Sequence, residues 1–501
     1  MAGPYFIGID GGTEGIRAGI FDARGRPLAF AATPYTTRFP APAHAEQDPV
    51  DWWAGCGQSV RKAMAAAGIP ADQVKGLAVD TTNCSVVLLD TEGEPVRPAM
   101  IWMDVRASKE ADEVAASGDK ALRVNSGGRG PVSAEWMIPK ALWLKRNEPD
   151  AFARAAYVCE YQDYLNLKLT GRLVASVYNV SARWHHDVTN GSQPTSLIDS
   201  LGIGELATKW PGEIVRLGEV VAPLSAEAAN HLGLKAGLPV SQGGADAGIG
   251  MIGLGVIRPG SLAFITGSSH LHLGLSEKPF AGEGIWGTYA NALLPGLHLV
   301  EGGQASTGSA INWFKRTLAA ETSYKTLDEE AAAVPAGANG LTALDHFQGN
   351  RTPFTDPHSR GAFAGLSLGH GRGHLFRALL ESVAMGSRLI LDTFEKGGFT
   401  LNDIVLAGGV TNSPLWLQIH ADIIGKPIAL TEVPDAPALG SAILAAVGSG
   451  HYANITEAVS AMVRRSRTIE PNMAVHGDYA EPYARYKALY ITQKDFRKAV
   501  A

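Results

Sequence analysis

An acidic residue followed by two glycines and a threonine stands near the start of the chain, between an apolar run and an alternating run. Residues 10–13 read Asp-Gly-Gly-Thr, the apolar run occupies residues 6–9, and the alternating run occupies residues 16–22. At such a corner, consecutive backbone N–H groups can converge on one anion, a threonine hydroxyl adds a donor, and a neighbouring carboxylate can hold Mg²⁺. The motif predicts a phosphate-binding hairpin, with an ordinary turn as the alternative.

Two further glycine corners follow predicted buried strands later in the chain. Residues 266–269 read Thr-Gly-Ser-Ser after the apolar run 261–265, and residues 408–412 read Gly-Gly-Val-Thr-Asn after the run 404–406. Two hairpin tips can close on phosphates from opposite sides, while a glycine pair lets an adenosine approach the backbone. The three corners together predict a nucleotide site.

The elements that must position these corners follow from apolar periodicity and from capping residues. A helix should begin at Pro49 behind the N-cap residue Asp48 and end at Gly68. The other expected strands are 6–10, 16–22, 28–34, 75–80, 86–90, 261–265, 271–275 and 404–406, and the other expected helices are 134–147, 162–170, 371–397, 413–424 and 436–449.

The strand and helix pattern restarts midway along the chain. We therefore expect an α/β fold of two similar domains, residues 1–252 and 253–501, which face each other across a cleft. The segment 253–260 is the expected hinge between them.

Composition limits the classes of function. The chain has 501 residues, 46% of them hydrophobic, and a net charge of −6 without a sustained basic run, so we expect no nucleic-acid partner. Cys56, Cys84 and Cys159 stand far apart, which argues against disulfides or a structural zinc and favours the cytoplasm. No apolar run approaches about 18 residues, so we expect no membrane span.

A spaced pattern in the second half gives the chain a family resemblance. Residues 361–366 (Gly-Ala-Phe-Ala-Gly-Leu) and 374–381 (His-Leu-Phe-Arg-Ala-Leu-Leu-Glu) resemble the C-terminal signature of the FGGY carbohydrate kinases. The resemblance covers essentially the whole chain and implies two actin-like, ribonuclease-H-like ATPase domains flanking a catalytic cleft. Its other segments are Asp10-Gly11-Gly12-Thr13, Trp102-Met103-Asp104 with Arg106, Gly243-Gly244-Ala245-Asp246, Gly303-Gln304, and Gly408-Gly409 with Asn412.

The resemblance implies an ATP-dependent sugar kinase that uses Mg²⁺. Asp246 is the expected general base, because phosphoryl transfer needs an acceptor for the proton of the attacking hydroxyl; a helix N-cap is the alternative role. Asp10 is the expected Mg²⁺ ligand. Glu14, where the family prefers a short polar residue, should point away from the phosphates or hold Mg²⁺ through water. The expected nucleotide and phosphate residues are Gly11, Gly12, Thr13, Thr266, Gly267, Ser268, Gly308, Gly408, Gly409 and Asn412.

Two segments resemble ribulokinases more than xylulokinases or glycerol kinases. Residues 133–140 carry a Ser-x-Glu-Trp run, and residues 80–84 carry Asp-Thr-Thr. Carboxylates can accept from sugar hydroxyls and an indole can cover an apolar sugar face, although Trp136 in the core and Glu135 on a solvated helix start are open alternatives. The expected substrate-binding residues are Asn83, Cys84, Asp104, Glu135, Trp136 and Asp246.

These expectations combine into one function with named rivals. The expected activity is phosphorylation of a terminal hydroxyl of a small sugar, with a pentulose such as ribulose favoured over xylulose, a tetrulose or a pentitol. An actin-like conformational ATPase is the rival of another class. The expected partner is a small sugar or polyol, and a homodimer remains open.

His270 and His272 alternate on one strand without a third metal ligand, so they should line the cleft or form a structural pair.

Overall fold

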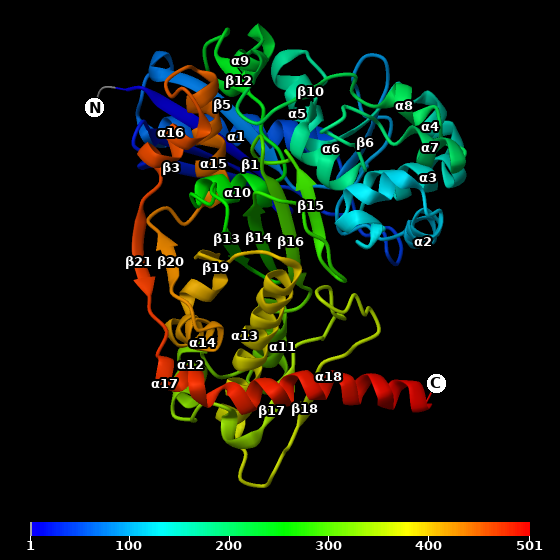
Figure 1. Cartoon of the computed structure of the whole chain (residues 1–501). Helices are drawn as coiled ribbons and strands as arrows, with labels where there is room; N and C mark the ends of the chain where they lie inside the picture. Colours follow the sequence, from blue (N-terminus) through cyan, green and yellow to red (C-terminus); the bar gives the residue numbers. More distant parts are fainter. Residues whose placement is uncertain (1–2, 501) are drawn as a thin grey trace.

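The computed structural model describes residues 3–500 as two large sheets with helices packed around and between them (Figure 1). The first sheet, at the top of Figure 1, has the order β11-β12-β5-β1-β2-β3. Strand β1 pairs antiparallel with β2 and parallel with β5. The strands are β11 Val220–Pro223, β12 Pro239–Ser241, β5 Val74–Thr81, β1 Tyr5–Gly11, β2 Gly15–Asp22 and β3 Pro27–Pro34.

The second sheet repeats this arrangement around β13. That strand pairs antiparallel with β14 and parallel with β19, as β1 does with β2 and β5. The strands in order are β15 Trp286–Ala290, β16 His298–Gln304, β14 His270–Ser276, β13 Ser261–Thr266, β19 Asp403–Gly408, β20 Ile428–Thr431 and β21 Arg465–Ile469.

Two helices pack against each other between the large sheets. They are α10, Asp246–Gly253, and α15, Ala436–Gly448, and α15 also covers β1 and β5. This contact requires a small residue in β1, because a Cβ on Gly8 would lie 1.8 Å from the carbonyl oxygen of Ala438. The strand that carries the first glycine corner is therefore fixed by a helix from the far end of the chain.

A smaller four-stranded sheet and its helices form the right-hand part of the first half in Figure 1. This part includes α3, Met137–Asn147, and α6, Val177–Arg183, which contacts β15 of the second sheet. The sheet has the order β4 Glu46–Gln47, β7 Ala99–Met100, β6 Val86–Leu89 and β8 Tyr157–Glu160.

The remaining elements surround these layers. The helices are α1 Pro49–Ala67, α2 Ser108–Ala116, α4 Pro149–Arg154, α5 Tyr161–Thr170, α7 Thr195–Ser200, α8 Leu206–Lys209, α9 Ala226–Leu232, α11 Gly308–Leu318, α12 Tyr324–Ala332, α13 Arg372–Gly397, α14 Pro414–Ile424, α16 Ile455–Met462, α17 Met473–Asp478 and α18 Ala480–Val500. Two two-stranded sheets join β9 Ala175–Ser176 with β10 Ile214–Val215, and β17 Thr342–Leu344 with β18 Ala362–Ala364.

The predicted two-domain α/β architecture is confirmed. The predicted helix start is also confirmed, since the side chain of Asp48 accepts from the Val50 N–H and Gly68 ends the helix in the left-handed region. His270 and His272 are fully buried, against the ring of Phe264, so neither lines the cleft. Within residues 3–500, no helix has both the length and the apolar character to cross a membrane.

Candidate active site

Three carboxylates meet at the carboxyl end of the first sheet. In the parallel pair β1–β5, Gly11 lies opposite Thr81, and Thr81 in turn bridges to Ala245. This register brings Asp10 and Asp80, which lie opposite each other, to the same edge as Asp246, the first residue of α10. Buried strands thus place three acids from distant parts of the sequence at one edge of the sheet, among them the predicted Asp10 and Asp246.

The environment of these acids favours their neutral forms. Burial is the largest effect on Asp10 and raises its pKa to about 7, against the lowering effect of Arg17, whose Nε lies 3.3 Å from the Asp10 carboxylate. Burial raises the pKa of Asp246 to about 6. Asp80 is fully buried, and burial again raises its pKa well above the usual range. At neutral pH Asp246 is therefore mostly ionised, with a pKa close to the range suited to general base catalysis.

The same carboxylates suit a hydrated magnesium ion. One oxygen of Asp80 accepts from the Ser441 hydroxyl, and the other is buried without a hydrogen-bond partner among the described residues. Across residues 3–500, no cluster of three or more His, Cys, Asp or Glu side chains forms a metal cage. Mg²⁺ characteristically binds one or two carboxylates and completes its shell with water and phosphate oxygens, so the residues present fit that mode.

Side chains hold the tip of the first hairpin from several directions. The Tyr35 hydroxyl donates to the carbonyl of Gly12. Trp102 Nε1 donates to the Thr13 hydroxyl over 2.9 Å, and the Gln47 amide donates to the Thr13 carbonyl over 2.7 Å. Glu14, the residue after Thr13, is exposed to solvent. The tip is therefore held by hydrogen bonds before any ligand binds.

The glycine at the start of this tip is required by its neighbours and not by its backbone conformation. Neither Gly11 nor Gly12 has a positive φ. A Cβ on Gly11 would instead lie 2.9 Å from the ring of Tyr161. Close approach to an aromatic side chain explains this glycine.

The second hairpin tip borders a cavity of about 840 Å³. Its backbone is tied to the start of α11, because the N–H of Gly308 donates to the carbonyl of Gly267 and the N–H of Ser309 donates to that of Ser268. The structure brings five predicted nucleotide residues together here, with aromatic and polar residues that the sequence motifs did not indicate. The predicted ones are Gly267, Ser268, Gly308, Gly409 and Asn412, and the additional ones include Trp313, Gln348, Phe376 and Trp416.

Two of the predicted phosphate residues have structural roles within the sheet. The Thr266 hydroxyl donates to the carbonyl of Ala407 and accepts from the N–H of Val410, so its hydrogen-bonding capacity is used within the sheet. Gly408 has φ of 98°, and a Cβ there would lie 1.9 Å from the Thr266 carbonyl oxygen. Neither residue lines the 840 Å³ cavity, although Gly408 borders a smaller one with Asn412, and their phosphate contacts stay a prediction.

The predicted substrate residues gather beyond the carboxylates. Trp136, Cys84 and Trp286 pack in one buried cluster, with the rings of Trp136 and Trp286 5.7 Å apart. The nitrogens Asn83 Nδ2, Trp136 Nε1 and Trp286 Nε1 are buried without a hydrogen-bond partner. Glu135 is partly exposed, with Arg351 3.9 Å away. Unpaired buried donors are costly, so this cluster is suited to a ligand with several oxygens.

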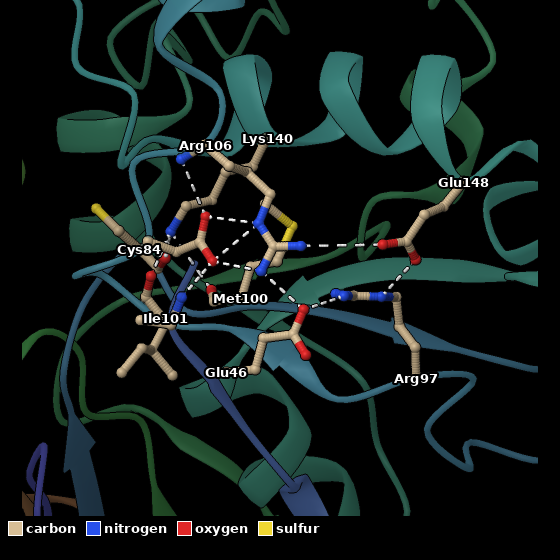
Figure 2. A network of polar contacts seen from close by, with 10 residues as sticks. Glu46, Cys84, Arg97, Met100, Ile101, Arg106, Lys140 and Glu148 are labelled. Carbon is tan, nitrogen blue, oxygen red and sulfur yellow. Dashed lines mark hydrogen bonds and ion pairs between the residues drawn. The ribbon is translucent and has the colours of Figure 1, made fainter. Parts of the chain in front are cut away.

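Asp104 does not join this cluster as a free acceptor. It is fully buried, and its oxygens accept from the Ala45 N–H and from the guanidinium of Arg106. Figure 2 shows the guanidinium of Arg106 in this network, where it also donates to the carboxylate of Glu46. The expected sugar contact of Asp104 is corrected to a role in holding the adjacent segments in place. Asp104 matches the family motif that begins at Trp102, but nothing in the sequence indicates that its side chain is buried.

Figure 2 also shows a buried lysine that braces the substrate segment. Lys140, in α3, donates from Nζ to the carbonyls of Cys84 and Ile101 over 2.7 Å each. Burial lowers its pKa to about 8. This contact ties the helix after Trp136 to the loop that contains Asn83.

Sequence reasoning missed a buried ion pair between the two halves of the chain. Arg183 in α6 and Glu301 in β16 lie 2.6 Å apart, and both are nearly inaccessible to solvent. The guanidinium lies 5.5 Å from the ring of Trp136 and 5.4 Å from that of Trp286. The partners are 118 residues apart in sequence and belong to no recognised motif, so only the folded chain shows the pair.

Comparison with known proteins decides the family. The models of the N-terminal and C-terminal domains of the FGGY family of carbohydrate kinases match residues 5–253 and 262–449. The chain belongs to this family. It is an enzyme of the carbohydrate kinase class, with a two-domain α/β fold.

Several relatives of this FGGY kinase match over nearly their whole length. An FGGY carbohydrate kinase domain-containing protein of Xenopus laevis is 31% identical, covering 98% of this chain and 97% of the relative. A ribulokinase of Shouchella clausii is 31% identical, covering 97% and 94%. The crystal structure of xylulose kinase from Rhodospirillum rubrum superposes with a TM-score of 0.88 at 31% identity, covering 98% and 99%.

Proposed function

We propose that this FGGY kinase transfers the γ-phosphoryl group of ATP to a terminal hydroxyl of a pentulose, with ribulose favoured. The observation that carries this proposal is the set of buried, unpaired donors at Asn83, Trp136 and Trp286. Asn83 lies in the loop after β5, which leaves the carboxylate edge where the N–H of Thr82 donates to the carbonyl of Gly11, and the two tryptophans pack with the next residue of this loop, Cys84. A polyhydroxylated substrate would satisfy these donors and reach Asp246.

Asp246 accepts the proton of the attacking hydroxyl in this proposal. Its carboxylate is held by the Ala247 N–H over 2.7 Å, and the preceding residue is fixed by a hydrogen bond from the Ala245 N–H to Asn179. A base whose pKa is about 6 is ionised at neutral pH and still basic enough to take a proton as the hydroxyl attacks. Mg²⁺, held by Asp10 with water and phosphate oxygens, would supply charge neutralisation on the phosphates.

The ATP site is proposed at the 840 Å³ cavity beside the second hairpin tip. Backbone groups at Gly308 and Gly409 leave room for the nucleotide, while Trp313 and Trp416 supply flat apolar surfaces. The first hairpin tip, with Gly11, Gly12 and Thr13, faces the phosphates from the carboxylate side in this proposal. Closure between the two halves would then exclude water from the transfer. We also propose that the enzyme acts in the cytoplasm.

A xylulose kinase is the second candidate. The named relatives support both substrates, since the ribulokinase and the R. rubrum xylulose kinase are each 31% identical to this chain. The Glu135-Trp136 segment favours ribulose, through its resemblance to ribulokinases. The two ketoses differ in the orientation of one hydroxyl, so their relative use depends on the donors and acceptors around the sugar.

Coupled measurement of ADP release with separate ketoses and polyols tests the proposal. We expect ATP turnover that depends on added sugar, with kcat/KM for a ribulose at least about tenfold above that for xylulose or ribitol. Mass spectrometry of the product should show one added phosphate. ATP turnover at a constant rate with no sugar would instead support the actin-like conformational ATPase.

A further inference from the structure

A second cavity, of about 650 Å³, lies apart from the residues assigned above to ATP and to the carboxylate edge. One wall comes from the 3₁₀ helix η2, Lys120–Val124, and from residues 185–196 after α6. The other wall comes from β15 and from His298 in β16. The volume is in the range of small-molecule sites, and the two walls come from different halves of the chain.

The rim of this cavity carries two unpaired cations. Lys120 and Arg123 are exposed, and among residues 3–500 neither side chain has an ion-pair or hydrogen-bond partner. The nearby acids are already engaged. Asp187 accepts from Asn190, and Asp119 accepts from the Ala121 N–H and the Ser196 hydroxyl. The free positive charge at the rim is therefore suited to an anionic group.

The interior is polar and has buried groups without partners. His185 is 3% exposed, and its Nε2 is buried with no hydrogen-bond partner, as is Nδ1 of His298. Burial lowers the pKa of His185 to about 4, so its ring is neutral at neutral pH and offers one donor and one acceptor. Gln193 also lines the cavity with its side-chain amide unpaired. Such imidazole and amide groups can form hydrogen bonds with the hydroxyls of a ligand.

Only one layer of side chains separates this cavity from the proposed sugar site. The ring of His185 lies 5.3 Å from that of Trp136. Tyr289 also lines the cavity, and its hydroxyl lies 3.4 Å from the guanidinium of Arg183. A backbone conformation with φ of 53° holds His185 in the left-handed region, which non-glycine residues rarely adopt.

We propose that this cavity is a second ligand site that binds a small phosphorylated sugar or polyol and changes the affinity of the active site for its own sugar. Lys120 and Arg123 hold the phosphate, and Gln193 and His298 meet the hydroxyls. A bound ligand joins the two halves of the chain beside His185 and Tyr289. The site goes beyond the proposed function, because its occupancy does not depend on which sugar is phosphorylated.

Isothermal titration of the full-length protein with D-ribose 5-phosphate, at saturating ADP and Mg²⁺, tests the site. The variant Lys120→Gln/Arg123→Gln should bind the ester about 10- to 100-fold more weakly than the parent, because two charge-assisted contacts are lost. The control Lys109→Gln/Arg154→Gln makes the same charge change at exposed positions outside the cavity and should bind as the parent does.

Two results of this titration would overturn the site. One is equal binding by the parent and by the Lys120/Arg123 variant, and the other is no binding by the parent up to about 10 mM. D-ribose and inorganic phosphate serve as partial probes, and each should bind more weakly than the ester. Inorganic phosphate that binds as tightly as the ester would refute the role of the hydroxyl-binding residues.

Steady-state kinetics test the link to the active site. At saturating ATP, D-ribose 5-phosphate should change the KM for the sugar substrate about fivefold or more in the parent, and leave it unchanged in Lys120→Gln/Arg123→Gln. A KM that stays constant in the parent while the ester binds would refute the coupling. Failure of the proposed function would appear separately, because the titration requires no turnover.

Discussion

The two glycine-cornered hairpins share one strand arrangement but present different chemistry. Each first strand, β1 or β13, lies between an antiparallel partner and a parallel strand. The first hairpin brings a buried carboxylate, Asp10, to its end, and the second ends in exposed Gly267 and Ser268. The same arrangement thus supplies a charge on one side and backbone and hydroxyl groups on the other.

The hairpins also differ in how their tips are held. Side chains from three separate segments, Tyr35, Gln47 and Trp102, bind the first tip. The second tip is bound by one segment at the start of α11, through its backbone N–H groups and the hydroxyls of Thr307 and Ser309. A carboxylate that must meet a metal ion benefits from a preorganised position. The second hairpin instead depends on the close approach of neighbouring backbone, since a Cβ on Gly308 or Gly408 would lie 2.4 Å or 1.9 Å from the carbonyl oxygen of Gly267 or Thr266. The comparison predicts that changes in the first hairpin affect catalysis and changes in the second affect stability.

The largest effect should come from Asp10→Asn, which removes the charge of the first hairpin. We expect kcat to fall about 10²- to 10³-fold, because the phosphates lose their metal anchor. Stability should not fall. The fold favours neutral Asp10, so stability decreases as pH rises from 3.8 to about 7, and the neutral amide avoids this loss. Steady-state rates and thermal unfolding at pH 8 measure both effects.

A matched control for this variant is Asp112→Asn on the exposed surface of α2, which should leave both kcat and Tm unchanged. An Asp10→Asn enzyme with near-parental kcat would show that the first hairpin does not supply the catalytic charge. The proposed difference in chemistry between the two hairpins would then be wrong.

The pH dependence of kcat/KM should follow Asp246. Burial raises its pKa to about 6, and the base must be ionised, so activity is present above about pH 6 and is lost below it. We expect about a tenfold fall per pH unit below the pKa, measured with a saturating coupling system between pH 5 and pH 8. A flat profile over this range would exclude a base with this pKa.

Stability should respond most to the threonine of the second hairpin. Thr266→Val leaves the N–H of Val410 and the carbonyl of Ala407 without their side-chain partner, and should cost about 1–3 kcal/mol of unfolding free energy. Thr13→Val loses one partly exposed bond from Trp102 and should cost about 0.5–1.5 kcal/mol. Urea unfolding measures both. A larger loss of unfolding free energy for Thr13→Val than for Thr266→Val would contradict the expected difference between the two hairpins.

Local patterns predicted most of the fold and the residues of the glycine corners. Alternation and capping were sufficient to predict the extent of β1, β2 and α1, because the β1–β2 hairpin and the caps of α1 are formed by residues that are close in sequence. Long-range burial was not predictable. Asp104 was placed in the sugar site by its motif, but Arg106 and Ala45 occupy its oxygens.

The partners of the Arg183–Glu301 pair and the walls of the 650 Å³ cavity come together only on folding. No spacing in the sequence marks either feature, because the segments that form them lie far apart along the chain. Tertiary contacts, rather than local propensity, determine the chemistry on the sugar side of the molecule.

The most direct test of the central claim is the rate of phosphoryl transfer in a single turnover by Asp246→Asn, measured by rapid quench with the preferred sugar. The account predicts a fall of about 10²- to 10⁴-fold, while ATP and sugar bind within a few fold of the parent. Transfer at a rate close to that of the parent would contradict Asp246 as the base.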